Sequence, residues 1–467
     1  MVAGELIWRG LDLVARELAL FAAAGILVGG IGDLCVDLLW IARAGWKRLF
    51  IYSRHRRATA AGFPAADRPG RIAVFVPAWH ESEVIGAMLR TACDHWAGAD
   101  IRLYVGLYPN DPDTIAAVAA VGDPRVRAAI NPRPGPTTKG DNLNAMWAAL
   151  LADEAAQGWQ AKAIVLHDAE DVVHPAEIRI YDRLIERFDL VQLPVVALVD
   201  PATPLFGRMI GAHYADEFAE AHGRTLVVRE AIGAAVPSAG VGCAFSRARL
   251  AAVADVRGGQ PFDADSLTED YELGLRIGEA GGRGVFVRVD DGVGGIVSVR
   301  AHFPVSLSAA VRQKARWMTG IALNGWDRLG WRGSPAERWM RFRDRQAVLA
   351  AVVLVAAYGA LACWGVLALA ELAGGYRPLV LEPWERALLI VNVGLLAWRL
   401  AMRALFVGRT HGWRQGLASV PRVIVANIVA MMAARRALAH YLHILRGGRA
   451  IWEKTTHIFP ADVKAAR

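Results

Sequence analysis

The chain has 467 residues, more than a single compact domain usually holds. Hydrophobic residues make up 54% of it and the mean hydropathy is +0.28, which argues against a wholly soluble protein. The net charge of +8 does not indicate nucleic-acid binding, because the basic residues gather beside apolar runs rather than in one stripe. The four cysteines show no Cys-x-x-Cys spacing, so neither a disulfide framework nor a structural zinc site is expected.

The first apolar run, residues 18–42, is long enough to cross a bilayer and reads as a retained anchor rather than a removed signal peptide. Asp33 and Asp37 interrupt it and lie on one helix face. Carboxylates inside a membrane usually face other protein groups, so we expect a basic partner such as Arg399 or Arg403. A shallow, tilted helix with both acids at the membrane surface is the alternative.

The middle of the chain alternates short apolar runs with helical stretches, which predicts an α/β domain with a mostly parallel sheet and helices on both faces. The expected strands are 71–77, 101–107, 163–167 and 190–194, and the expected helices are 81–96, 141–157 and 271–279. Ligands of such sheets bind beyond the carboxyl ends of the strands. The first three strands end at Pro77, near Asp111 and at Asp168, so acidic residues collect at the expected binding edge.

The C-terminal third contains three further apolar stretches. Residues 347–370 carry no charge and form the clearest spanning helix, and residues 387–407 are a second candidate. Residues 421–445 mix apolar and basic residues, and Pro421 suits a first helical position, so we expect an interfacial helix. We expect three spans with interfacial helices, and a fourth span is the alternative. The basic flanks of the middle domain place that domain in the cytoplasm.

These expectations divide the chain into five parts. They are an N-terminal membrane helix with a basic juxtamembrane segment (1–60), a cytoplasmic catalytic domain (70–300), interfacial helices (301–346), two transmembrane helices (347–407), and an interfacial helix with a basic tail (408–467).

Three short motifs in this order carry a family resemblance. They are Asp168-Ala-Glu-Asp171, Thr268-Glu-Asp270 and Gln313-Lys-Ala-Arg-Trp317. Followed by membrane helices, they resemble the signature of membrane-integrated family 2 glycosyltransferases. The resemblance implies an α/β GT-A (Rossmann-like) domain inserted between transmembrane helices, and an inverting transfer of sugar from a nucleotide-sugar.

The first motif resembles the metal-binding acids of that family, which implies Mg²⁺ or Mn²⁺ at Asp168, Glu170 and Asp171. Glu170 stands where the family usually has Asp. A glutamate still offers oxygen ligands, but its longer side chain leaves open whether Glu170 or Asp171 binds the metal. A surface acidic turn is the alternative.

Two segments resemble the family's nucleotide-binding loops. Pro77-Ala-Trp-His-Glu81 is similar to the loop that holds the base, and Asp111, with Asp113 as second choice, stands where an Asp contacts uracil or ribose. The alternative for Asp111 is a plain Asn-Asp-Pro turn.

Lys139-Gly-Asp-Asn-Leu-Asn144 resembles a Lys-containing segment at a helix start, where a cation suits a pyrophosphate. The alternative for Asp141 and Asn142 is a helix-capping turn. Together with Asp111, the resemblance implies a UDP-linked donor.

The acceptor side is implied by three segments. Ser238–Phe245 is similar to the Gly-rich acceptor segment, and the second motif implies Asp270 as general base beside Glu269. The alternative is that Thr268 and Asp270 only cap a helix. In the third motif the resemblance implies that Trp317 stacks on the acceptor sugar and Arg316 contacts the diphosphate, with Gln313 in the same clamp; a basic helix on a membrane surface is the alternative.

A closer resemblance covers nearly the whole chain. His167–Val172, the Asp-containing first helix and Trp452–His457 look like the inner-membrane B subunits of the phage N4 adsorption system. Longer members of that family carry a regulatory domain that would lie beyond Arg467. The resemblance implies a transferase of the bacterial inner membrane that builds a cell-envelope glycan, with an outer-membrane export subunit as a possible partner. The alternatives are a single addition to a lipid acceptor, and a scaffold or receptor subunit with a decayed site.

Overall fold

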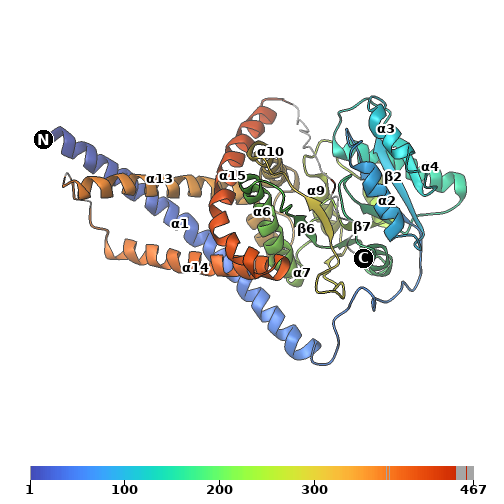
Figure 1. Cartoon of the computed structure of the whole chain (residues 1–467), viewed down its shortest axis with the longest axis horizontal. Coiled ribbons are helices and arrows are strands. Elements are labelled where there is room, and N and C mark those ends of the chain that lie inside the picture. The colour runs from blue at the N-terminus through green and yellow to red at the C-terminus, as the bar shows by residue number, and fades with distance from the viewer. Residues whose placement is uncertain (1, 375, 378, 449–458, 460–467) are drawn as a thin grey trace.

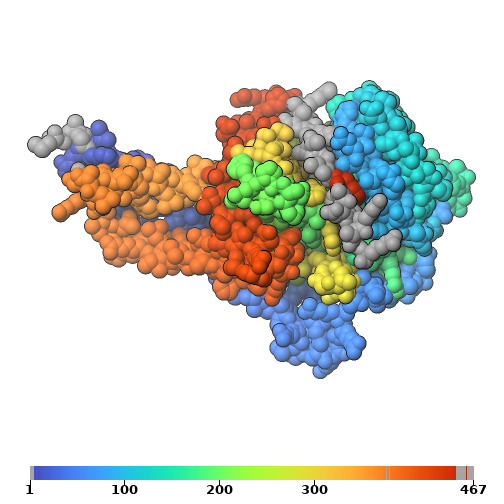
Figure 2. Space-filling model, in the orientation of Figure 1, coloured from blue at the N-terminus to red at the C-terminus, as the bar shows by residue number. Residues whose placement is uncertain are grey.

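The computed structural model describes residues 2–374, 376–377, 379–448 and 459. Long apolar helices project as a narrow stalk from a broader domain built on a β-sheet (Figures 1 and 2). The Trp452–His457 run that contributed to the resemblance lies outside the described residues.

The larger sheet has seven strands in the order β3-β2-β1-β4-β7-β5-β8, and a second, two-stranded sheet pairs β6 with β9. The strands are β1 (Ile72–Pro77), β2 (Ile101–Leu107), β3 (Val126–Ile130), β4 (Ala163–Leu166), β5 (Leu190–Gln192), β6 (Val195–Leu198), β7 (Cys243–Ser246), β8 (Gly284–Phe286) and β9 (Val299–His302). Only β7 is antiparallel to its neighbours, β4 and β5. The four strands expected from the sequence are present as β1, β2, β4 and β5, and the expected mostly parallel sheet is confirmed.

Strand β1 shows why this sheet is covered on both faces. Successive side chains of a strand point to opposite sides. Ile72, Val74 and Val76 are buried in one core cluster, whereas Ala73 and Phe75 are buried in another. A strand that is apolar at every position therefore needs helices on both faces, and the domain provides them.

The helices that cover the sheet pack against these two clusters. They are α2 (Ile85–His95), α3 (Pro112–Ala119), α4 (Lys139–Gln157), α5 (Glu177–Leu184), α8 (Arg247–Asp255) and α9 (Glu269–Glu279). Met88 and Leu89 of α2 belong to the first cluster, and Leu143 and Met146 of α4 belong to the second.

A layer of shorter helices lies between the sheet and the long apolar helices (Figure 1). It consists of α6 (Leu205–Glu220), the π-helical turn η2 (Ala221–Thr225), α7 (Leu226–Ala231), α10 (Leu307–Trp317), the π-helical turn η3 (Met318–Asn324), α11 (Gly325–Leu329) and α12 (Pro335–Arg345). Helix α6 packs on both α14 and α15, so the layer joins the two halves of the molecule.

Among the described residues, four helices are long and apolar enough to cross a membrane. They are α1 (Val2–Trp46), which continues into the π-helical turn η1 (Lys47–Ile51), α13 (Ala347–Leu372), α14 (Pro383–His411) and α15 (Trp413–Leu445). In Figure 1, α15 runs across the direction shared by α13 and α14. The three-span layout stays a prediction.

The start of the last helix differs from expectation. Pro421 was expected at a first helical position, but it lies inside α15, which begins eight residues earlier at Trp413 after Gly412. Gly412 has φ +88°, a left-handed conformation that ends α14 and lets the chain turn into α15. The expectation was wrong because the glycine, rather than the proline, sets the boundary.

The two acids that interrupt the apolar run of α1, Asp33 and Asp37, are both paired. Asp33 lies 3.2 Å from Arg399 and 2.7 Å from Arg343, which confirms one of the expected partners. Asp37 instead pairs with Arg224 at 2.6 Å. The other expected partner, Arg403, turns to Asp216 and Glu220 of α6.

Candidate active site

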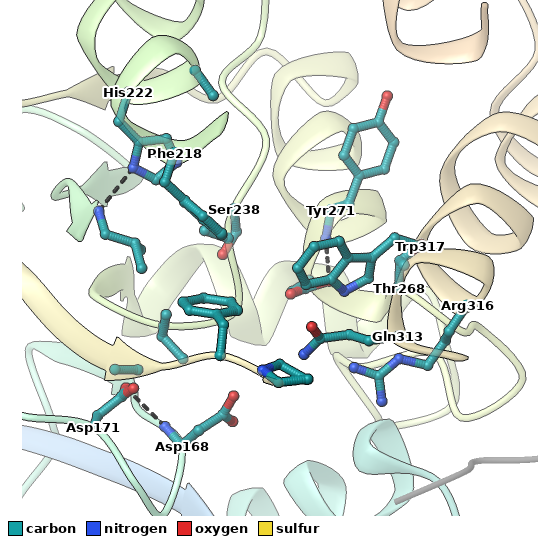
Figure 3. A pocket seen from close by; sticks show the side chains of 18 of the residues that line it. Asp168, Asp171, Phe218, His222, Ser238, Thr268, Tyr271, Gln313, Arg316 and Trp317 are labelled. Carbon is teal, nitrogen blue, oxygen red and sulfur yellow. Dashed lines mark hydrogen bonds between the residues drawn. The ribbon is translucent and has the colours of Figure 1, made fainter. Parts of the chain in front are cut away.

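A cavity of about 470 Å³ opens between the sheet edge and the helical layer. It brings together nine of the residues singled out in the sequence, namely Lys139, Asp168, Glu170, Asp171, Glu269, Asp270, Gln313, Arg316 and Trp317. Asp168 and Asp171 lie on one side, and Gln313, Arg316 and Trp317 lie on the other (Figure 3). Pro77, Glu81 and Asp111 do not line it.

The acidic loop after β4 is held in shape by one of its own carboxylates. Asp171 Oδ2 accepts a hydrogen bond from the backbone N–H of Asp168 at 3.0 Å and lies 3.0 Å from His167 Nδ1. Asp171 is 2% exposed, whereas the side chain of Asp168 is 34% exposed. Asp171 therefore stabilises the loop, and Asp168 is the acid of this pair that presents its oxygens to the cavity.

His167 completes this support. Its ring is fully buried between Asp171 and Glu177, whose Oε2 lies 3.1 Å from Nε2. Burial alone would lower the pKa of His167, but the two carboxylates outweigh that effect and raise the pKa to about 9. A protonated imidazole thus lies behind the loop and balances two buried acids.

Lys139 lies between the acidic loop after β4 and the two acids at the start of α9, and it interacts with both. It is the first residue of α4, whose N-cap Thr138 accepts from the backbone N–H of Asp141. Its Nζ donates to Asp168 Oδ1 at 2.6 Å. Burial would lower the pKa of Lys139, but Asp168, Glu269 and Asp270 raise it above its usual value. The ammonium therefore stays charged within the cluster.

The carboxylates at the start of α9 share a crowded, largely buried place. Burial and then the neighbouring charge of Asp270 raise the pKa of Glu269 to about 7, and burial also raises the pKa of Asp270. Asp270 lies directly against Gly240, where any side chain would collide with its carboxylate. Gly240 also has φ +75°, so both its backbone conformation and the closeness of Asp270 require glycine there.

The hydrogen bonds at the start of α9 argue against the alternative that Thr268 and Asp270 only cap this helix. Thr268 is the N-cap residue of α9, but its side chain makes no capping hydrogen bond. Asp270 Oδ1 accepts only from the adjacent N–H of Tyr271 among the hydrogen bonds of the described residues. Two neighbouring acids with raised pKa values that face a cavity are suited to proton transfer.

Three residues of the third motif, Gln313, Arg316 and Trp317, lie on one face of α10 and line the cavity. The ring of Trp317 packs edge-on against Tyr214, Phe218 and Phe303, with centroids 6.0–6.5 Å apart. Among the described residues, Gln313 Oε1 and Arg316 Nε are buried and have no hydrogen-bond partner. Such atoms are costly unless something else satisfies them, so both are suited to a polar ligand.

Asp111 has a structural role that the sequence left open. It caps α3, with Oδ1 accepting from Thr114 N, and its Oδ2 accepts from His80 N at 2.6 Å. Glu81 N donates to Thr114 Oγ1 at 3.0 Å. These residues lie at the carboxyl ends of β1 and β2, on the same sheet edge as Asp168 but outside the cavity. Their role toward a nucleotide stays a prediction.

Several cavity residues were missed in the sequence. His302 and Phe303 come from the end of β9, and His222 from the π-helical turn η2. Arg229 and Tyr271 both bond to Asp344 of α12 at 2.6 Å. No local pattern marks these residues, because β6, β9 and α12 meet the site only through tertiary packing.

A divalent cation fits this donor set, although no ready-made cage exists. Within the described part of the chain, no three His, Cys, Asp or Glu side chains are grouped so that they could hold a metal ion by themselves. Mg²⁺ is commonly held by one or two carboxylates together with substrate phosphates and water. Asp168 and Glu170 line the cavity and offer oxygens of that kind.

Comparisons with known proteins agree with this geometry. Residues 69–320, more than half of the chain, match the family described as "Glycosyltransferase like family 2". The chain is 35% identical over 484 aligned residues to the bacteriophage adsorption protein B of Escherichia coli (strain K12), and equally to the bacteriophage N4 adsorption protein B of Escherichia coli O157:H7. The match covers 97% of this chain but 63% of each relative, so the chain spans less than two thirds of their length.

A solved structure shows the same fold. The mannosyltransferase from Pyrobaculum calidifontis, determined in complex with GDP-Man and Mn²⁺, is 15% identical and superposes with a TM-score of 0.51. The match covers 92% of this chain and 99% of that one. The expected GT-A fold flanked by apolar helices is thereby confirmed. The chain belongs to glycosyltransferase family 2.

Proposed function

We propose that the protein is a metal-dependent, inverting glycosyltransferase of the bacterial inner membrane. It transfers sugar from a UDP-linked nucleotide-sugar to a growing cell-envelope glycan. The observation that carries the proposal is a single cavity that holds an acid pair with raised pKa values, Glu269 and Asp270, and two unsatisfied buried polar atoms, on Gln313 and Arg316.

The donor end of the cavity would be the Asp168 side. Asp168 and Glu170 would hold Mg²⁺ or Mn²⁺, which when bound neutralises charge on the leaving diphosphate. Lys139 is held near this position by Asp168 at 2.6 Å, so its ammonium can also face the diphosphate. Arg316 would add a further cation from the opposite wall, where its Nε lacks a partner among the described residues.

The acceptor end would be the Asp270 side. Asp270, beside Glu269, takes the proton from an acceptor hydroxyl, and the resulting oxygen attacks the anomeric carbon from the face opposite the leaving group. A single displacement of this kind inverts the configuration. Trp317 offers a ring to the acceptor sugar, and Gln313 offers an amide oxygen.

A single addition to a lipid acceptor is the second candidate function. The observation in its favour is the apolar part of the cavity wall, formed by Leu198, Val199, Leu226 and Val305. This part adjoins α6, which packs against α14 and α15. An acceptor with a hydrocarbon chain would find apolar contacts there.

The membrane arrangement belongs to the same proposal. Basic residues on both flanks of the sheet domain favour the cytoplasmic side for that domain, with the loop between α13 and α14 on the opposite side. A growing glycan would then need a way across the envelope, and an outer-membrane export subunit is the proposed partner.

The test is transfer by the purified chain in lipid, assayed against UDP-, GDP- and TDP-sugars with Mg²⁺ or Mn²⁺. Polymeric products support the growing-glycan function, and a single sugar on an extracted lipid supports the second candidate. Binding of a sugar nucleotide without transfer to any acceptor would support the alternative of a scaffold with a decayed site.

A further inference from the structure

A second cavity, of about 480 Å³, lies between β6, the loop after β8 and the junction of α14 with α15. In Figure 2 this loop (yellow) projects beside the red and orange helices. Four arginines line the cavity, namely Arg288, Arg300, Arg409 and Arg422, together with His411. A single carboxylate, Asp216, lines it among the described residues.

That carboxylate is already neutralised. Arg422 donates to both oxygens of Asp216, at 2.6 and 2.9 Å, and Arg403 approaches from behind at 3.3 Å. Arg422 also bonds to Gln415. Asp216 therefore has no capacity left for the other arginines of the cavity.

The remaining three arginines form a surplus of positive charge. Within the described residues, none of Arg288, Arg300 and Arg409 forms an ion pair with a carboxylate. Arg288 donates to the backbone oxygen of His222 at 2.7 Å, and Arg409 stacks over Trp40 at 5.2 Å. Burial and then the like charge of Arg409 lower the pKa of Arg288. An anion between them would relieve this repulsion.

The place of the cavity favours a phosphate over other anions. Arginines that converge from separate elements match the several oxygens and multiple charge of a phosphate better than a single carboxylate. Arg409 lies in the last turn of α14, at the end of an apolar helix where phospholipid headgroups gather. Glycines 294 and 295 leave the opposite wall open.

We propose that this cavity is a binding site for a phosphate or phosphodiester group, separate from the sugar-transfer site. Two sources share this chemistry, the headgroup of an anionic phospholipid and a soluble phosphorylated molecule. The site adjoins the first cavity, because Leu198 and Val199 line both and Arg288 holds the backbone of His222, which lines the first. The proposal does not depend on the proposed function.

The test uses the full chain in dodecyl maltoside and phosphate-free buffer, with thermal unfolding followed by tryptophan fluorescence. One arm adds inorganic pyrophosphate, a second adds phosphatidylglycerol, and a third adds diacylglycerol, which has similar tails and no phosphate. The double variant Arg288→Gln/Arg409→Gln removes two surplus cations that are exposed to the cavity. Arg414→Gln is the matched control, because Arg414 stacks on Trp413 and does not line the cavity.

We expect pyrophosphate or phosphatidylglycerol to raise the Tm of the wild type. The concentration for half the effect should rise about tenfold or more in the double variant and stay unchanged in Arg414→Gln, since each charge-assisted hydrogen bond is strong. A response to phosphatidylglycerol alone assigns a lipid headgroup, and a response to pyrophosphate assigns a soluble ligand. Arg300→Gln provides a second variant if the double variant does not fold.

Several results would overturn the proposal. They are no response in either phosphate arm, an equal response to diacylglycerol, an unchanged response in the folded cavity variants, and an equal loss in Arg414→Gln. Loss of the response in Arg316→Gln would also overturn it, because the phosphate would then bind in the first cavity.

Discussion

Lys139 Nζ donates to Asp168 Oδ1 at 2.6 Å, so the first residue of α4 holds the acid that follows β4. The same ammonium acts on Glu269 and Asp270 at the start of α9. One lysine thus connects the proposed donor end of the cavity to the proposed base.

Removing this cation should shift the pH dependence of activity. Burial and Asp270 raise the pKa of Glu269 to about 7, and Lys139 opposes them. Lys139 also lowers the pKa of Asp270, the proposed base, which shares this buried place with Glu269. A base works when deprotonated, so activity should rise with pH as this pair of acids loses its protons. In Lys139→Met the pKa should rise further, and the acid limb of the kcat/KM profile should move to higher pH.

Lys139→Arg is the control, because it keeps the charge and should keep the limb near its wild-type position. A limb that stays in place in Lys139→Met, with lower activity at every pH, would mean that the lysine acts only on the donor.

The two aspartates of the acidic loop should differ in their effects on transfer and on stability. Asp168→Asn should strongly lower transfer with either Mg²⁺ or Mn²⁺. It should lower Tm less than Asp171→Asn does, because the pair of Asp168 with Lys139 is partly exposed. Asp171→Asn should lower the unfolding free energy by about 1.5–3 kcal/mol, because it weakens charge-assisted bonds to a buried histidine and a backbone amide. The loop would be only a structural turn if the two variants lowered Tm equally and Asp168→Asn left transfer unchanged.

Trp317 should matter more for the acceptor than for the donor. Stacking of a ring on an aromatic side chain contributes about 1–3 kcal/mol, by analogy with nucleobases. Trp317→Ala should therefore weaken elongation while nucleotide affinity stays near wild type, and Arg316→Ala should do the reverse. Trp326→Ala is the control, because this exposed tryptophan of α11 packs on Trp331 outside the cavity. Normal transfer with reduced membrane association in both variants would make α10 an interfacial anchor.

The charge pairs between α1 and the helical layer should be essential for stability. Asp37 and Arg224 are 2.6 Å apart and almost fully buried. Asp37→Asn removes the nearest carboxylate of Arg224 and leaves only the more distant Asp33, at 3.6 Å, and Glu220, at 4.0 Å. Breaking such a pair typically costs about 3–5 kcal/mol, measurable as a large fall in Tm in detergent. Glu5→Gln, which removes an exposed pair with Arg9, should cost no more than about 0.5 kcal/mol. Similar losses in both variants would contradict this account.

How much the sequence could predict depended on the range of the interactions. The continuous apolar run of Ile72–Pro77 and the acid two residues after Ala163–Leu166 are local features, so the sequence predicts the first strands and the Asp168 edge. The antiparallel direction of β7 could not be predicted, because a short apolar run shows the same pattern whether the strand is parallel or antiparallel to its neighbours. The capping of α3 by Asp111 is local, but an Asn-Asp-Pro turn and a nucleotide contact look alike in sequence.

The remaining cavity residues depend on distant parts of the chain. His302 reaches the site because β9 pairs with β6, about a hundred residues earlier in sequence. Asp33 found its partner Arg399, as expected, but Arg224 and Arg343 came from helices whose packing on α1 has no local signature. Long-range packing of this kind has no local sequence pattern, so a single sequence does not predict it.

The central claim is sugar transfer with Asp270 as the base, and one measurement tests it most directly. Transfer from the panel of sugar nucleotides is compared between wild type, Asp270→Asn and the control Asp265→Asn, an exposed acid in the preceding loop. We predict that the wild type and Asp265→Asn transfer sugar, whereas Asp270→Asn still binds the nucleotide and turns over about 10²-fold more slowly or less. Full turnover in Asp270→Asn, or no transfer by the wild type from any donor, would contradict the claim.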